Sequence, residues 1–162
     1  WAGGAAAGPE ASRGRRIADV GSGAGLPGIP LAICLPECRF TLIERMDRRA
    51  GFLANTLAVL GLQNAEVEAG EMEKAEPGRF DCAVFRALKP LDPALLKTLF
   101  RLLGQNGFLA AYKGRKTAAG AELDALQDHG GGKLIPSPVP FLGEERHLLI
   151  IRPVRGGENE TL

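Results

Sequence analysis

The chain has 162 residues, of which 45% are hydrophobic and 24% are charged, and its formal net charge is +1. This length suits one domain with a sizeable core, and the near-neutral charge excludes a broadly basic nucleic-acid binder. No apolar run is long enough to span a membrane. Cys34, Cys38 and Cys82 lie in or beside apolar segments, and their odd number favours reduced core thiols in a cytoplasmic protein without a metal site.

The first regular element follows an Ala- and Gly-rich lead-in over residues 1–14, which we expect to be poorly ordered or the stub of an N-terminal region. A short apolar strand is predicted over residues 17–20. The tight turn after it contains three glycines, Gly21, Gly23 and Gly25. Pro27 then suits the first turn of a helix, whose free N–H groups would face a small molecule bound over the loop.

Two classes of cofactor bind over such a loop. Residues 23–28 match the dinucleotide fingerprint G-x-G-x-x-G, which favours a nicotinamide-dependent (NAD) oxidoreductase. Asp19, at the carboxyl end of the strand, would repel a pyrophosphate but attract the cationic groups of S-adenosylmethionine. Glu44 ends the next strand, predicted over residues 39–44, where it can accept both hydroxyls of a ribose in either cofactor. Asp19 therefore favours S-adenosylmethionine, and the oxidoreductase remains the alternative.

The second predicted helix begins with Asp47 as its N-cap and ends at Gly61. Its apolar residues at helical spacing are Phe52, Leu53, Leu57 and Leu60. Arg48 and Arg49 lie in its first turn, where cations are unfavourable because the helix dipole is already positive there. They are either contacts to the phosphates of a nucleic acid or solvated surface charges.

The remaining elements alternate between strands and helices, which indicates a mostly parallel sheet covered on both faces. Strands are predicted over residues 65–69, 80–86, 107–112 and 147–151, with an edge strand or loop over 133–141. One helix begins with Asp92 as N-cap, followed by Pro93, and is closed by Gly104. A peripheral helix is predicted over residues 117–128.

Charged residues come at or just after the ends of five predicted strands: Asp19, Glu44, Glu73, Arg86 and Lys113. Because parallel strands bring their carboxyl ends to one edge of a sheet, we expect these side chains to line a ligand site there. The two histidines, His129 and His147, are predicted to be structural or solvated. The sequence therefore contains no arrangement suited to nucleophilic catalysis.

Five segments resemble those of one known family: DVGSGAGLPGIPLAI (19–33), FTLIERMDRRAGFL (40–53), FDCAVFRAL (80–88), YKG (112–114) and ERHLLII (145–151). On these segments the chain resembles the RsmG or GidB family, the bacterial 16S ribosomal RNA guanine-N7 methyltransferases. The resemblance covers nearly all of residues 17–152. The L-P-G-I-P extension of the glycine loop is far more specific than a G-x-G-x-G motif.

The resemblance implies an α/β fold, namely the Rossmann-like fold of class I S-adenosylmethionine-dependent methyltransferases. Its sheet is mostly parallel and seven-stranded, with the last strand antiparallel. We place this domain at residues 15–153, before a flexible tail at 154–162. Family members usually carry an Arg ahead of Met72, where this chain has Glu71. By motif position the resemblance implies cofactor contacts from Gly21, Leu26, Met72, Glu73 and Arg86, with Glu44 at the ribose, in addition to Asp19, Gly23 and Gly25 from the loop.

The implied activity is methyl transfer from S-adenosylmethionine to N7 of a guanine in 16S ribosomal RNA, free or in an assembling small subunit, by a cytoplasmic monomer. Guanine N7 has a free lone pair at neutral pH, so the reaction needs positioning rather than a general base. Arg86, Lys113 and Arg146 would act at the guanine edge or the nearby phosphates. Further phosphate contacts are expected from residues that must share one face, Arg48, Arg49, Arg115 and Lys116. A non-enzymatic alternative is an inactive RNA-binding module that retains the fold.

Overall fold

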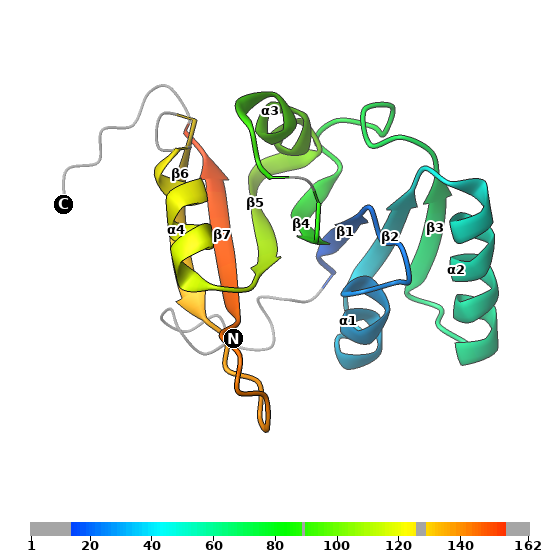
Figure 1. The fold of residues 1–162 in the computed structure, drawn as a ribbon. Helices are drawn as coiled ribbons and strands as arrows, with labels where there is room; N and C mark the ends of the chain where they lie inside the picture. The colour runs from blue at the N-terminus through cyan, green and yellow to red at the C-terminus, as the bar shows by residue number, and fades with distance from the viewer. Residues whose placement is uncertain (1–13, 89, 126–128, 155–162) are drawn as a thin grey trace.

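Seven strands form one sheet at the centre of the protein (Figure 1), in a computed structural model that describes residues 14–88, 90–125 and 129–154. The strands are β1 (Arg16–Val20), β2 (Arg39–Glu44), β3 (Ala65–Ala69), β4 (Phe80–Arg86), β5 (Leu103–Lys113), β6 (Gly130–Pro136) and β7 (His147–Pro153). Their order across the sheet is β3-β2-β1-β4-β5-β7-β6. Strands β1 to β5 pair in parallel, whereas β7 is antiparallel to both of its neighbours. The predicted sheet with an antiparallel last strand is confirmed.

The helices of the described residues are α1 (Gly28–Cys34), α2 (Asp47–Leu60), α3 (Pro93–Arg101) and α4 (Lys116–Asp124). Figure 1 shows α1 and α2 at the end of the sheet that holds β2 and β3, and α4 beside β6 and β7 at the other end. The short α1 connects β1 to β2, and α2 connects β2 to β3, so each parallel pair is joined by a helix that crosses over.

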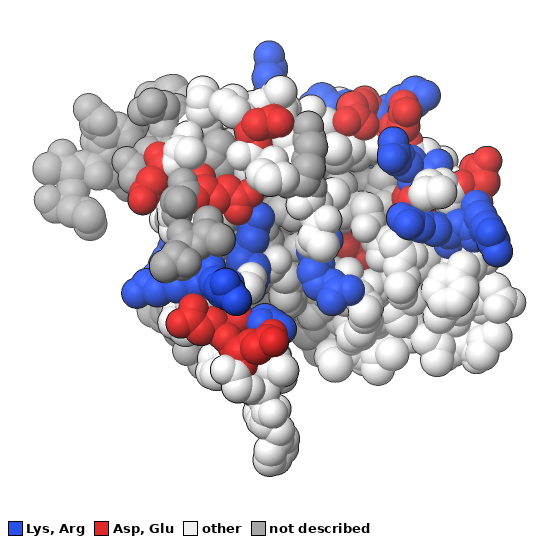
Figure 2. Space-filling view, in the orientation of Figure 1, with Lys and Arg blue, Asp and Glu red and all other residues white. Residues whose placement is uncertain are grey.

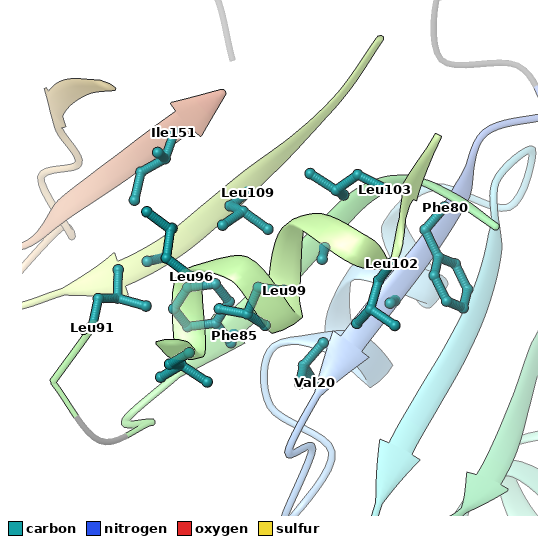
Figure 3. Packing of buried hydrophobic residues seen from close by; sticks show 14 of the residues in the cluster. Val20, Phe80, Phe85, Leu91, Leu96, Leu99, Leu102, Leu103, Leu109 and Ile151 are labelled. Carbon is teal, nitrogen blue, oxygen red and sulfur yellow. The ribbon is translucent and has the colours of Figure 1, made fainter. Parts of the chain in front are cut away.

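Side-chain alternation along β1 assigns the helices to the two faces of the sheet. Val20 packs in the cluster that contains Leu99 of α3 (Figure 3). Ile17 belongs to a second cluster with Ala32 of α1. Because successive side chains of a strand point to opposite faces, α3 and α1 cover opposite sides of β1. Asp19 therefore lies on the face that α1 covers.

Most of the predicted element boundaries are confirmed. Asp92 caps α3 as predicted, because its Oδ1 accepts a hydrogen bond of 2.7 Å from the N–H of Leu95, and Pro93 occupies the first helical position. Gly61 ends α2 with a φ of 64°, in the left-handed region that favours glycine. The segment predicted as an edge strand or loop contributes β6, which does lie at the edge of the sheet, although the strand begins at the glycines and ends at Pro136.

Several predicted helix boundaries are wrong. Pro27, predicted in the first turn of a helix, is the N-cap of α1, and the helix predicted over residues 117–128 is α4, which ends at Asp124. Asp47 is the first residue of α2 rather than its cap; Met46 takes the cap position, and no side chain caps the helix. The Asp47 carboxylate instead lies in the first turn, where the helix dipole favours an anion. Gly104 does not close α3 but lies in β5, which starts beside Phe80 before a register shift. Glycine at position 107 lets β5 approach the backbone of β4 closely, since a Cβ there would lie 3.1 Å from the Phe80 carbonyl oxygen.

Some residues predicted to be buried are exposed. Phe52 and Leu60 of α2 are 54% and 49% exposed, because α2 buries only a narrow stripe against the sheet. Cys38 and Cys82 are buried as predicted, but Cys34, the last residue of α1, is exposed. The predicted lead-in, except Gly14, the tail from residue 155 and the helix end at 126–128 lie outside the described residues.

Candidate functional site

The glycine loop turns directly from β1 into α1, and positive φ angles make the turn possible. The φ angles of Gly21, Gly23 and Gly25 are 68°, 57° and 83°, which residues with a side chain rarely adopt. The N–H groups of Gly21 and Ser22 donate to the carbonyl oxygen of Ile43 at 2.9 and 3.2 Å. These two bonds fix the loop against the end of β2.

Glu44, the last residue of β2, is held by backbone donors on both of its oxygens. The N–H of Gly23 donates to Oε2 at 2.9 Å, and the N–H of Met46 donates to Oε1 at 3.0 Å. The residue is only 4% exposed, yet it lines a pocket. Because each carboxylate oxygen has two lone pairs, the Glu44 side chain can still accept two more hydrogen bonds, as a ribose diol would require.

This first pocket has a volume of about 590 Å³ and lies at the carboxyl ends of β1, β2 and β3. Of the predicted cofactor-binding residues, Gly21, Glu44, Met72 and Glu73 line it. The N–H of Gly23 holds Glu44 in place. Gly25 is buried within the loop. Leu26 is 40% exposed and does not line the pocket. The remaining lining residues are Val20, Ile43, Arg45, Arg49, Gly70, Glu71, Ala87, Leu88 and Leu95.

Asp19, which was predicted to contact the cofactor, has its side chain beneath the loop. It is fully buried, and its Oδ2 accepts a 3.0 Å bond from the N–H of Gly28 at the start of α1. A Cβ on Gly28 would lie 2.5 Å from that oxygen, so only glycine allows this approach. Oδ1 is buried with no hydrogen-bond partner among the described residues, and burial raises the pKa of Asp19 to about 6. Asp19 thus positions the loop from within the core.

The turn after β3 is fixed by an arginine from α3. Arg101 Nη2 donates to the carbonyl oxygens of Met72 and Glu73 at 2.9 and 2.8 Å, which holds both residues at the pocket wall. Glu71, the residue that departs from the family pattern, also lines this pocket and forms an exposed ion pair of 3.0 Å with Lys74. The pocket therefore has acidic side chains on the β2 side and the β3 side.

A second pocket of about 670 Å³ lies next to the first, at the ends of β4, β5 and β7. Ala87 and Leu88 line both pockets, so the segment directly after β4 separates them. Ala87 has a φ of 55°, an unusual value for a residue with a side chain. The other lining residues are Arg86, Tyr112, Lys113, Gly114, Ser137, Val139, Arg146 and His147.

The three residues predicted to act at the guanine, Arg86, Lys113 and Arg146, all line this second pocket. The prediction that Arg86 also contacts the cofactor is not supported, since Arg86 is absent from the wall of the first pocket. Lys113 Nζ lies 2.6 Å from Glu122 Oε2, and Arg146 Nη2 lies 2.6 Å from Glu144 Oε2. The second pocket is thus cationic, but acidic neighbours offset part of its charge.

His147 belongs to this pocket wall, which its predicted structural role did not anticipate. Its Nδ1 lies 2.8 Å from the carbonyl oxygen of Gly114. A carbonyl oxygen can only accept, so Nδ1 carries the proton and the ring ties the start of β7 to the end of β5. His129 is exposed. Sequence reasoning also missed Ala87 and Leu88, although their position directly after a strand ending in Arg86 was a usable signal.

The four residues predicted to contact RNA phosphates do not form one group. Arg49 lines the first pocket, whereas Arg115 lies near the other end of the sheet, beside α4. Arg48 and Lys116 are exposed, and the Lys116 N–H donates to Glu145 Oε2 at 3.0 Å. Figure 2 shows basic side chains in separate groups, one over the start of α2, another near α4 and a smaller one between them, with uncharged or acidic surface separating the groups.

Among the described residues, no helix is long and apolar enough to cross a membrane. Solved structures share the fold. A protein described as a predicted O-methyltransferase from Agrobacterium tumefaciens superposes with a TM-score of 0.70 at 21% identity, over 86% of this chain and 74% of that one. A SAM-dependent methyltransferase from Aquifex aeolicus gives a TM-score of 0.69 at 17% identity, over 89% of each chain. The predicted class I methyltransferase fold is confirmed.

Proteins related in sequence identify the family, whereas the solved structures show only the fold. The ribosomal RNA small subunit methyltransferase G of Treponema denticola is 43% identical over 141 residues, which cover 83% of this chain and 56% of that protein. The protein of the same name from Treponema pallidum is 40% identical over 148 residues, with coverages of 88% and 66%. The chain thus spans 56–66% of the length of these relatives. Because residues 5–149 also match the GidB profile, described as rRNA small subunit methyltransferase G, the chain belongs to that family.

Proposed function

We propose that the chain transfers a methyl group from S-adenosylmethionine to N7 of a guanine in 16S ribosomal RNA. The observation that carries this proposal is the pair of adjacent pockets that share Ala87 and Leu88. A methyl donor in one pocket and a base in the other would meet at this shared wall. Family membership supports the substrate class, and the exact guanine is left to experiment.

The first pocket fits S-adenosylmethionine by size and by charge. Its volume of about 590 Å³ is within the usual range for small-molecule sites. Glu44 offers a preorganised acceptor for the ribose, and Glu71 and Glu73 supply negative charge for a cofactor with a sulfonium and an ammonium group. Arg45 and Arg49 line the same pocket, where they can form ion pairs with the carboxylate of that cofactor.

The second pocket fits a nucleobase attached to a phosphate backbone. Arg86, Lys113 and Arg146 line it, and guanidinium and ammonium groups donate to base-edge acceptors and to phosphate oxygens. Tyr112 also lines this pocket, and partial burial raises the pKa of its hydroxyl, which can donate a hydrogen bond at neutral pH. The wall is therefore built from hydrogen-bond donors that suit an electron-rich base.

Bound S-adenosylmethionine supplies a methyl group that is already activated by the positive sulfur. The side chains need only hold N7 in line with that methyl group and exclude water. Their cationic character would also orient the phosphates on either side of the base. No proton has to leave N7, so we expect the rate of the chemical step to stay nearly constant between about pH 6.5 and 8.5. A steep loss on acidification would instead indicate a general base.

The test is methyl transfer with purified protein, methyl-labelled S-adenosylmethionine and 16S RNA, either free or in small subunits. We expect label in N7-methylguanosine after digestion and mass spectrometry. Cofactor and RNA binding without label would favour the inactive RNA-binding module. Binding of NAD in place of S-adenosylmethionine would favour the oxidoreductase. We further propose that the chain acts as a cytoplasmic monomer, which sedimentation of the purified protein with and without RNA would check.

A further inference from the structure

Glu122 of α4 bonds two segments that border the pockets. With Lys113 and Leu91 it lines a third pocket of about 500 Å³, but it lines neither the cofactor pocket nor the second pocket. Its Oε2 lies 2.6 Å from the Nζ of Lys113 at the end of β5. Its Oε1 accepts a 2.6 Å hydrogen bond from the N–H of Leu91. One carboxylate therefore connects α4, β5 and the segment that leads from Leu88 into α3.

The Lys113–Glu122 pair is largely shielded from solvent. The side chains are 19% and 14% exposed, whereas the Arg146–Glu144 pair of the same pocket region is 38% and 71% exposed. Ion pairs that are exposed contribute little, because water and salt screen them. A shielded pair fixes both partners, since separating them would leave a poorly solvated charge. Lys113 is therefore held in one place, unlike a surface lysine.

We propose that Glu122 is a positioning residue for the RNA-binding pocket, which acts by holding Lys113 in the wall of that pocket. An ammonium group has three N–H donors, and Glu122 takes one. The other donors are then presented by a side chain that has already lost its conformational freedom, so binding an acceptor costs less entropy. The pair is also neutral as a unit, so Lys113 serves as a directed hydrogen-bond donor rather than as a general attraction for phosphate.

The bond to Leu91 gives Glu122 a second effect that can be separated from the first. Leu91 is buried in the same cluster as Val20 and Leu95, and Leu88 packs against that cluster while lining both pockets. The Leu91 N–H thus anchors the segment that carries the shared wall. A glutamine at position 122 can still accept from Leu91 but has no charge to hold Lys113. An alanine can do neither.

The experiment compares Glu122→Gln, Glu122→Ala, Lys113→Met and the double variant Glu122→Gln/Lys113→Met. RNA affinity, KM for RNA, S-adenosylmethionine affinity and hydrogen exchange of the Leu91 amide are measured. Glu122→Gln should weaken RNA affinity and raise KM for RNA roughly tenfold, with S-adenosylmethionine affinity unchanged and Leu91 still protected. Glu122→Ala should also lose protection at Leu91. Exposed Glu76, which lines neither pocket, provides Glu76→Gln as the control for loss of one negative charge.

The double variant decides whether Glu122 acts through Lys113. If it does, adding Glu122→Gln to Lys113→Met should change RNA affinity no further. Additive losses in the double variant, or wild-type RNA affinity in Glu122→Gln, would overturn the proposal. The inference about Glu122 rests on the proposed RNA substrate, but different results would contradict the two proposals. Absence of methyl transfer by the wild-type protein would contradict the function, whereas RNA titrations would still test Glu122.

Discussion

The two pockets border the same short segment after β4, but they fix their polar groups in different ways. In the first pocket, Glu44 is held by two backbone N–H groups from nearby turns. In the second, Lys113 and Arg146 are held by carboxylates of other side chains. Backbone donors cannot move without moving the fold. The shielded Lys113–Glu122 pair is also fixed, whereas the more exposed Arg146–Glu144 pair can rearrange. We therefore expect the first pocket to be preformed for its proposed cofactor, whereas the wall of the second pocket can adjust around Arg146.

This difference predicts that substitutions beneath the first pocket greatly reduce stability and cofactor binding. Substitutions around the second pocket should have smaller effects that vary from residue to residue. The glycine loop, Asp19 and the start of α1 form one close-packed unit, in which Gly28 contacts Asp19 and Leu42. The second pocket has no comparable unit in the part of the chain that the structure describes. Variants of the two regions should therefore differ both in stability and in which ligand they affect.

The largest effect is expected for Gly28→Ala. A Cβ there would lie 2.4 Å from Leu42 Cδ2 and 2.5 Å from Asp19 Oδ2, so the buried start of α1 must shift. We expect a loss of about 3 kcal/mol in the free energy of unfolding, measured by urea denaturation, together with weaker cofactor binding. Gly51→Ala in α2 is the control, since nothing lies within 4 Å of its Cβ. That variant should gain up to about 1 kcal/mol, and equal losses in both would refute the packing argument.

The buried carboxylate of Asp19 should make stability depend on pH. Its pKa rises from 3.8 to about 6 in the folded state, so the folded protein binds the proton more tightly than the unfolded chain. The Asp19 contribution should therefore be greatest below about pH 4 and be lost as pH rises through about 6, by roughly 2–3 kcal/mol. Asp19→Asn should remove this component from the pH dependence of the free energy of unfolding. If the free energy of unfolding depended on pH in the same way in the variant and the wild type, Asp19 would not be the source of this pH dependence.

Glu44→Ala tests the preformed acceptor. It removes the proposed ribose contact and leaves the N–H groups of Gly23 and Met46 without the Glu44 carboxylate as their acceptor. S-adenosylmethionine affinity, measured by calorimetric titration, should fall by about 2 kcal/mol, which is the scale for hydrogen bonds to a charged group. Unchanged affinity would remove Glu44 from the site.

The smallest effects are expected at the start of α2, where Arg48 and Arg49 differ in surroundings. Arg48→Glu should lower the slope of log RNA affinity against log salt by about 0.7 to 0.9 if Arg48 contacts a phosphate, with no change in cofactor affinity. Arg49 lines the first pocket, so Arg49→Glu should also alter S-adenosylmethionine affinity. An unaltered salt slope in both variants would make them solvated surface charges.

The sequence placed residues in both pockets, because strand ends bring side chains to one edge of the sheet. The glycine turn and Glu44 lie close together along the chain, and strand ends placed both at one edge of the sheet. Glu122 reaches Lys113 only through the packing of α4, which no spacing in the sequence reveals. The burial of the Asp19 side chain could not be predicted either. The end of a strand predicts which edge a residue reaches, but its side chain points to one face, here beneath α1.

The most direct test of the division between the pockets measures two affinities in two variants. S-adenosylhomocysteine and 16S RNA are each titrated into Glu44→Ala, from the first pocket, and Arg146→Met, from the second. We predict that Glu44→Ala weakens S-adenosylhomocysteine binding at least about tenfold with RNA affinity nearly unchanged, and that Arg146→Met does the reverse. Similar losses of both ligands in either variant would contradict the assignment of one pocket to the cofactor and the other to the RNA.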